Sequence, residues 1–278
     1  MLGDSSRRGV VLSTTSTVVV LAVLVGIFLL APGSAQVRHT FFNPADMWRS
    51  FVGDPKAGYY SVGEALWLNI RMFVAAEVLI LIVALAVAVV RQSTGPVLLP
   101  LRVAATVYVD MARGVPLILI IFALGYGLPA LQLKGISAQS AAVYGVAALV
   151  LSYSAYVAEV YRAGIESIHP SQIASARSLG LTRWKSMRFV VIPQAVRRVV
   201  PPLLNDFVAL QKDTALVAFV VAVPEAFLQA QIFQQADFNF TPLLCAALLF
   251  LMITIPLTRL VDYLLAKQRR RRQAGMAL

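Results

Sequence analysis

Charged residues, histidine and cysteine are scarce in this chain. Of its 278 residues only 13% are charged, and it has 2 histidines and 1 cysteine. The lone Cys245 cannot form an intramolecular disulfide, and with His39 and His169 lying outside the apolar runs no Cys/His metal site can be assembled. No carboxylate pair has a recognisable catalytic spacing, which argues against an intramembrane enzyme. No Gly-x-x-x-x-Gly-Lys-Ser/Thr phosphate loop occurs, so the chain is expected to be non-catalytic.

Apolar residues dominate instead. They make up 59% of the chain, and the mean hydropathy of +0.77 is too high for a soluble domain of this size. Several apolar runs approach the roughly 20 residues that cross about 30 Å of hydrocarbon. The sequence therefore predicts an all-α, polytopic membrane protein with six transmembrane helices, at about 10–31, 64–90, 103–124, 139–161, 200–222 and 242–266.

The basic residues predict the orientation of these helices, because cytoplasmic loops are enriched in Lys and Arg. The opposite side holds only Arg38, Arg49, Lys56 and Lys134. Both ends are therefore expected in the cytoplasm, since most of the 24 basic residues fall at the ends or in alternate loops: Arg7, Arg8, Arg91, Arg102, Arg162, Arg177, Arg183, Lys185, Arg188, Arg197, Arg198, Lys267 and Arg269 to Arg272.

Three regions follow from this arrangement. Residues 1–62 would hold the first helix and an extracytoplasmic loop, 63–266 the transmembrane domain, and 267–278 a basic cytoplasmic tail. The first apolar segment also has the features of a cleavable signal peptide, because a basic start and an apolar stretch precede the small residues 33–35. We favour retention, and cleavage would leave five helices with the same orientation.

A cytoplasmic loop at about 162–198 is longer than a connection between neighbouring helices requires. Pro170 suits a first helical turn, and Gly180 can end that helix in a left-handed conformation. Thr182 can cap a second short segment, which Pro193 is expected to stop. The sequence of the loop thus predicts a helix-turn-helix at the membrane surface. Its residues are compatible with two roles, a docking site for a partner or a scaffold that faces anionic lipid.

The same loop resembles a motif of the membrane subunits of ATP-binding-cassette importers. The pattern is Glu-Ala-Ala, three residues, Gly, nine residues, Ile, one residue and Leu-Pro. Here it reads Ala174-Ser175-Ala176, Gly180, Val190 and Ile192-Pro193, with complete spacing. Two departures matter: Ala174 replaces the usual glutamate, which puts any contact of that carboxylate in doubt, and Ala215-Leu216 replaces the usual Ser-Leu.

Four further blocks resemble the polar amino acid branch of that family, the histidine and glutamine permease type. They are YVDMARGVPL from Tyr108, AYVAEVYRAGIESI from Ala155, VIPQAVRRVVPPLLND from Val191 and LQKDTAL from Leu210. The resemblance covers most of residues 64–265 and implies a five-helix permease core with one extra N-terminal helix. It implies an importer subunit in the bacterial cytoplasmic (inner) membrane.

The resemblance also implies partners. These are an ATP-binding-cassette ATPase dimer that holds ATP and Mg, an extracytoplasmic amino-acid-binding protein, and a second permease that is identical or homologous; membrane lipid surrounds them, and no nucleic acid is involved. The ATPase would dock on a coupling loop formed by Ser167, Pro170, Gln172, Ala174, Ser175, Ala176, Arg177, Leu179 and Gly180.

An ionisable group inside a membrane helix destabilises the protein unless it is paired or faces water, so each such residue is a candidate for the substrate pathway. Asn205 and Lys212 are seven residues apart, as are Asp206 and Asp213, which predicts two adjacent polar stripes extended by Thr214. A zwitterionic amino acid needs an anion for its ammonium and donors for its carboxylate. Asp206 is the preferred candidate, whereas Lys212 and Asp213 are open to a purely structural pairing.

Two more charged residues are candidates for this pathway. Arg113, followed by Gly114 and Pro116, can place its charge at a broken helix that lines a cavity, or it can snorkel to the interface. Glu159 is also a candidate, with a local pair to Arg162 as its structural alternative. An ion-gradient-driven secondary transporter of small polar solutes is the rival function, with Asp206 and Asp213 as ion sites. It would not need the long cytoplasmic loop.

Overall fold

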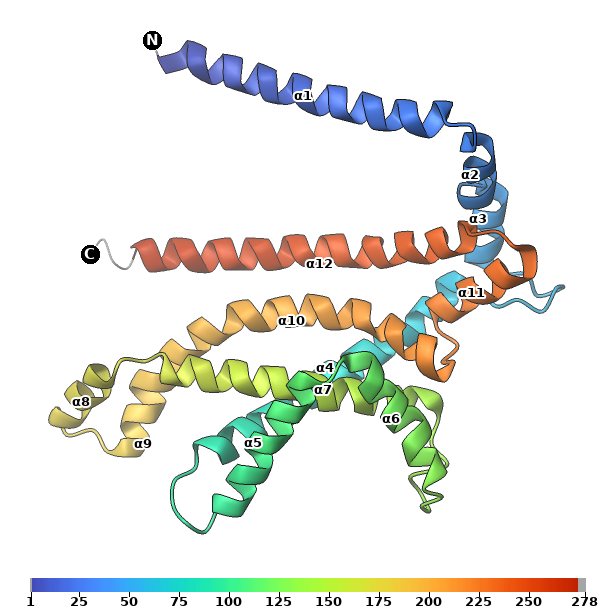
Figure 1. Ribbon diagram of the computed structural model, residues 1–278. Helices are drawn as coiled ribbons and strands as arrows, with labels where there is room; N and C mark the ends of the chain where they lie inside the picture. The colour runs from blue at the N-terminus through green and yellow to red at the C-terminus, as the bar shows by residue number, and fades with distance from the viewer. Residues whose placement is uncertain (1, 275–278) are drawn as a thin grey trace.

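The computed structural model describes residues 2–274, and their regular structure is helical (Figure 1). The tail prediction at 275–278 lies outside the described residues. The elements in chain order are α1 Leu2–Leu30, α2 Ser34–Phe41, α3 Pro44–Val52, α4 Val62–Gln92, α5 Leu99–Gly114, α6 Leu117–Ala130, α7 Ala141–Glu166, α8 Pro170–Ser178, α9 Arg183–Ser186, the π-helix η1 Met187–Val191, α10 Ile192–Val221, α11 Ala226–Asp237 and α12 Thr241–Ala274.

Four helices are long and apolar enough to span a membrane. They are α1, α4, α7 and α12, and two bent pairs, α5 with α6 and Arg183–Val221 with α11, raise the number to six if each pair is one span. The predicted six helices agree with this upper number. An apolar span longer than 18 residues is a strong local signal, which explains why the positions of α4, α7 and α12 were predicted within a few residues.

The helix predicted at 103–124 is not continuous, because the chain breaks within it into α5 and α6, at the Gly114 to Pro116 step that the sequence marks as a possible break. The two helices meet at an angle of 110°. Val115 and Pro116 are extended at the break, with ψ of 130° and 135°. Pro116 has no N–H to donate and disfavours helical backbone in the residue before it, so the helix ends at Gly114.

Pro193 does not stop a helix, contrary to the prediction. Thr182 caps α9 by accepting a hydrogen bond from the Lys185 N–H at 3.3 Å, and the chain then continues through the π-helix into α10. Pro193 lies in the first turn of α10, where its missing N–H costs little, and the π-turn before it absorbs the irregularity. The segment that leads out of the loop is therefore joined directly to a long membrane helix.

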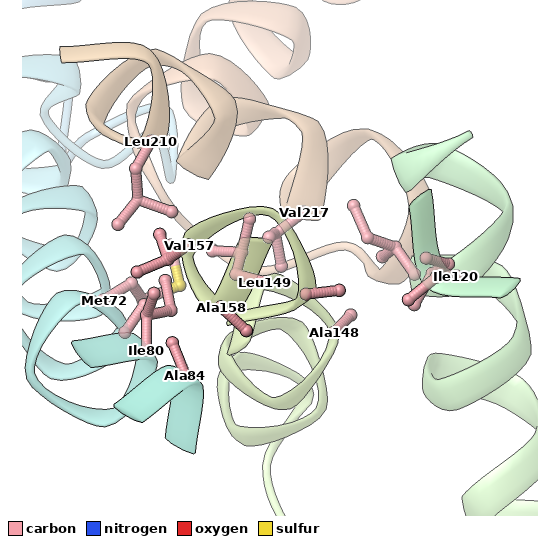
Figure 2. Close-up of a cluster of buried hydrophobic side chains, with 14 of the residues drawn as sticks. Met72, Ile80, Ala84, Ile120, Ala148, Leu149, Val157, Ala158, Leu210 and Val217 are labelled. Carbon is pink, nitrogen blue, oxygen red and sulfur yellow. The ribbon is translucent and has the colours of Figure 1, made fainter. Parts of the chain in front are cut away.

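The hydrophobic core is built around α7. Figure 2 shows Leu149, Val157 and Ala158 of α7 surrounded by side chains of α4, α6 and α10. Ala76 and Ala84 of α4, like Ala158, are fully buried. Small side chains at these positions let α4 and α7 approach closely, which is how membrane helices gain packing energy when lipid offers no hydrophobic drive.

The N-terminal region divides into two parts. The apolar window of α1 has no buried residue, and α1 lies apart from the bundle (Figure 1). In contrast, α3 packs on α12 and α4, and Met47 and Tyr59 contact the second core cluster, which contains Val62, Ala230 and Phe233. Residues 34–61 thus pack against the same body as the predicted region 63–266.

Candidate functional site

A polar cavity of about 450 Å³ lies beside the break between α5 and α6. Three elements meet there: the break itself, the middle of α7 and the middle of α10. Its lining includes one guanidinium and two carboxylates. The lining residues are Arg113, Gly114, Val115, Pro116, Leu117, Ser152, Tyr153, Tyr156, Asp206, Ala209 and Asp213.

Asp206 and Asp213 line this cavity two helical turns apart on α10. The Tyr153 hydroxyl donates to Asp213 Oδ2 at 2.6 Å, which fixes that carboxylate. Among the residues that the structure describes, the Asp206 side chain makes no hydrogen bond or ion pair. Glu77 of α4 is close enough to repel the Asp206 charge. An unpaired, half-buried carboxylate in this setting favours a cation, so Asp206 is suited to receive an ammonium group.

Arg113 of α5 brings a positive charge to the lining of the same cavity. Its guanidinium lies 5.7 Å from the ring centre of Tyr156, and the Tyr156 hydroxyl donates to the Arg113 carbonyl at 3.1 Å. The helix break exposes this part of the backbone, and irregular backbone at membrane depth is tolerated where it borders a cavity. The cavity therefore offers a fork of N–H donors and a carboxylate to the two ends of a zwitterion.

The other predicted pathway residues lie elsewhere. Asn205 and Lys212 form the other predicted stripe. Both are exposed, and neither lines the cavity that contains Asp206. Thr214 is buried, where its Oγ1 accepts from Asn69 Nδ2 at 3.2 Å. Glu159 pairs with Arg91 at 2.8 Å and with Arg162. Of the seven candidates, the structure brings together Asp206, Asp213 and Arg113.

Sequence reasoning missed the groups that organise this region. Tyr156 lies in the block that begins at Ala155, and Tyr153 lies two residues before that block; neither was predicted to line the substrate pathway. Glu225, which is fully buried, caps α11 by accepting from the N–H groups of Phe227 and Leu228 at 3.0 and 2.9 Å. Asn69 Nδ2 also donates to Glu225 at 2.6 Å. Pro224 signals the end of the preceding helix, but Glu is not among the preferred N-cap residues, so the sequence offered no strong local signal for Glu225.

A larger groove of about 720 Å³ lies on α4 and α7. Its wall is apolar except for Arg71, Tyr108 and Ser154, and it contains no carboxylate. A groove without an anion gives an ammonium group no partner. We therefore regard the smaller, charged cavity as the better candidate for a polar solute.

Ion pairs connect the ends of two core helices next to the predicted coupling loop. Arg91 at the end of α4 pairs with Glu159 of α7 at 2.8 Å. Arg162 pairs with both Glu159 and Glu166, and Arg198 of α10 donates to the Ser167 carbonyl. These contacts join α4, α7 and α10 where the loop leaves the membrane helices.

The predicted coupling loop contains α8, whose surface differs from the one expected. Ala174 and Ser175 are exposed, but Ala176 is only 5% exposed because it packs against its own loop. Of the remaining loop residues, Ser167, Pro170, Gln172, Arg177, Leu179 and Gly180 are exposed. Leu179 is 84% and Trp184 69% exposed, so two large apolar side chains are left without a partner.

Gly180 ends α8 as predicted. Its φ is +83°, and the Leu181 N–H donates to the Ala176 carbonyl at 3.1 Å, the closing bond of a Schellman motif. At the other end His169 caps α8, with its Nδ1 3.2 Å from the Ser171 N–H. Both ends of this short helix are thus fixed by local hydrogen bonds.

Comparison with known proteins agrees with this architecture. Residues 99–270 match the family model of the binding-protein-dependent transport system inner membrane component. A probable amino-acid permease protein of Bacillus subtilis, YxeN, is 32% identical over 72% of this chain and 87% of its own length. A probable glutamine ABC transporter permease protein of the same species, GlnM, is 38% identical over 66% of this chain and 82% of its own length.

Solved structures give the same result. The crystal structure of an amino acid ABC transporter with histidines superposes with a TM-score of 0.67 at 29% identity, covering 74% of this chain and 93% of the other. A methionine ABC transporter, MetNI, shares the fold with a TM-score of 0.56 at 17% identity. The chain is a multi-pass membrane protein, and it belongs to the family of inner membrane components of binding-protein-dependent transport systems.

Proposed function

We propose that this chain forms the translocation path for a polar amino acid in an ATP-driven importer. The observation that carries the proposal is the cavity of about 450 Å³, which combines Arg113 with Asp206 and Asp213 beside a broken helix. Arg113 would bind the substrate carboxylate and Asp206 its ammonium. Tyr153 would hold Asp213 in place.

The substrate class is supported by the relatives, whose names specify glutamine or amino acids in general. The charges of the cavity agree with it, because an amino acid presents one cationic and one anionic group to any binding site. The identity of the substrate side chain depends on the rest of the path.

The energy for transport would come from a separate ATPase subunit. The chain lacks a phosphate loop, so ATP and Mg would be held by a separate ATPase dimer docked on the α8 region. The exposed Ala174, Ser175 and Leu179 support such a docking surface. A binding protein would deliver substrate from outside, and a second permease, identical or homologous, would complete the path in the inner membrane.

The test is uptake by the assembled complex in proteoliposomes, measured with a panel of labelled amino acids. Asp206→Asn should reduce ATP-dependent uptake about tenfold or more, because a hydrogen bond to a charged group contributes ~1.5–3 kcal/mol. Asp262→Asn removes an exposed carboxylate of α12 far along the chain from the cavity and is the matched control. Co-purification of the ATPase should be unchanged in both.

Two results would contradict the proposal. Uptake that follows an ion gradient and ignores ATP would favour the secondary-transporter alternative. Normal uptake by Asp206→Asn would remove that carboxylate from the path.

A further inference from the structure

The groove of about 720 Å³ on α4 and α7 is separate from the polar cavity, and the two share no lining residue. Ala75 and Leu79 of α4 lie along one wall, and Val143 and Leu151 of α7 lie along the other. Leu79 is 46%, Val143 47% and Leu151 40% exposed. The groove therefore opens at the outer surface of the bundle, where lipid can enter it.

Arg71 is the one polar side chain of this lining that the described residues leave without a partner. The Tyr108 hydroxyl donates to the Leu151 carbonyl at 2.6 Å and lies 2.6 Å from Ser154 Oγ, so the other polar groups are satisfied within the chain. Arg71 makes no hydrogen bond or ion pair with any described residue. An unpaired guanidinium within the α4 span is expected to meet water or an anion from outside the chain.

The nearest acidic residue along the same face of α4 does not reach this site. Glu64 lies two turns before Arg71, about 10 Å along the helix axis, and it does not line the groove. Since the lining itself contains no carboxylate, the positive charge of Arg71 is not neutralised there.

Arg71 lies toward one end of the groove. The helices α4 and α7 run in the same direction, because Arg91 near the end of α4 pairs with Glu159 in the last part of α7 at 2.8 Å. Arg71 therefore shares its end of the groove with Ala142, which is in the first turn of the α7 span. This end faces away from the α8 loop and lies near the membrane surface.

The groove is long enough for an acyl chain. From Leu68 to Val83 its α4 wall advances about 22 Å at ~1.5 Å per residue, which exceeds half of the roughly 30 Å hydrocarbon layer. Beyond Arg71, the α4 side of the lining is apolar throughout. The groove thus joins a cation near headgroup depth to an apolar channel that crosses one leaflet.

We propose that this groove binds an anionic phospholipid. Its phosphate would contact Arg71, and one acyl chain would lie along Ala75, Leu79 and Val143. Charge complementarity favours this occupant, because the lining offers an unpaired cation to a phosphate and no carboxylate to the ammonium of a phosphatidylethanolamine headgroup. The site shares no residue with the substrate path, so it does not depend on the proposed function.

The test is lipid retention by the full chain, purified from vesicles of phosphatidylglycerol and phosphatidylethanolamine in a ratio of about 1:3 and measured by native mass spectrometry. Wild type should retain phosphatidylglycerol preferentially. Arg71→Gln should weaken this preference about fivefold, the change that corresponds to ~1 kcal/mol for one cation near a lipid surface. Arg71→Lys keeps the charge and should keep most of the preference. The side chain is exposed, so the fold should survive both substitutions.

Matched variants separate a built site from diffuse attraction. Lys134→Gln removes the same charge from an exposed position in the loop before α7, outside the groove, and should leave retention unchanged. Ala75→Trp fills the groove without altering charge and should reduce retention at least as strongly as Arg71→Gln. Val74→Trp adds a similar bulk at the neighbouring position, which is 52% exposed and does not line the groove, and should have no effect.

Three outcomes would overturn the proposal. Equal losses in Arg71→Gln and Lys134→Gln, or equal retention of the two lipids by wild type, would mean that the chain attracts anionic lipid only through its net charge. Unchanged retention in Ala75→Trp would mean that no acyl chain occupies the groove. Unchanged retention in Ala75→Trp together with an altered oligomeric state would assign the groove to a protein partner.

Discussion

The hydroxyl of Tyr153 donates a 2.6 Å hydrogen bond to Oδ2 of Asp213, which joins α7 to α10 at the wall of the polar cavity. Both side chains are half-buried. Asp213 is thereby held by the protein itself, whereas the Asp206 side chain, two turns away, has no such contact among the described residues and is the carboxylate that we propose for the substrate.

Removing this hydroxyl should loosen α10. Tyr153→Phe is expected to lower the free energy of unfolding by about 1.5–3 kcal/mol, the contribution of a hydrogen bond to a charged group, and to slow uptake. Thermal unfolding of the purified chain and uptake by the complex measure the two effects. Tyr263→Phe removes a hydroxyl from an exposed position of α12 and serves as the control. If both variants unfold alike, the Tyr153 bond adds nothing to stability.

The contact between Gly145 of α7 and Val217 of α10 leaves no room for a side chain. A Cβ at position 145 would collide with Val217 Cγ1. Gly145→Ala should therefore destabilise the chain by about 1–3 kcal/mol, the usual cost of overpacking, and adding Val217→Ala should recover most of the loss. Gly127→Ala, which meets nothing within 4 Å, is the control for helix propensity. A double variant no more stable than Gly145→Ala would contradict this account.

Bulky substitutions in α8 should distinguish an effect on ATPase docking from an effect on folding. Ala174→Trp places a large ring on an exposed position and should reduce ATPase co-purification without changing the melting temperature. Ala176→Trp should lower both, because Ala176 is buried, so this substitution no longer tests docking alone. Gly180→Val should also strain the loop, since φ there is +83°. Arg183→Ala should have little effect. Wild-type co-purification in Ala174→Trp would remove this face from the interface.

An ion pair between α3 and the loop before α4 is expected to depend on pH. Arg49 Nε donates to Asp54 Oδ2 at 2.9 Å, and this hydrogen bond holds the pKa of the Asp54 carboxyl below its ordinary value. Because the folded pKa lies below the unfolded value of ~3.9, the pair stabilises the fold above that value and loses its effect as pH falls through the folded pKa.

The melting temperature of Asp54→Asn should accordingly fall below that of wild type at neutral pH, and the difference should vanish in acid. In an Arg49→Gln background the same substitution should have a smaller effect at neutral pH, because the hydrogen bond from Arg49 is already absent. A difference that persists at low pH would mean that Asp54 acts through its turn, where its Oδ1 accepts from the Ala57 N–H at 3.2 Å.

Cysteine labelling tests the proposed orientation. In a Cys245→Ala background, Ala45→Cys should react with an impermeant thiol reagent in intact cells and Ser178→Cys should not, because most basic residues fall on the side of position 178. Both positions are exposed. The opposite labelling pattern would invert the topology.

Sequence patterns alone were enough to predict the class of protein, the main spans and the family. These follow from local features: apolar runs such as α4 and α12 must be long enough to cross a bilayer, and Pro170 and Gly180 fix the ends of α8 through backbone geometry alone. The position of the break after Arg113 was also visible as Gly114 and Pro116, although its angle of 110° was not.

Which polar groups meet depends on how the helices pack, and local patterns do not predict it. Asn205 and Asp206 are adjacent in sequence, yet one is exposed and the other lines the cavity, because packing of α10 on α7 sets which side of the helix faces inward. Asn69 and Glu225, 156 residues apart, form a buried hydrogen bond that no local pattern encodes. Membrane helices are apolar on nearly every side, so periodicity carries little information about their inward face, and contacts between helices must supply it.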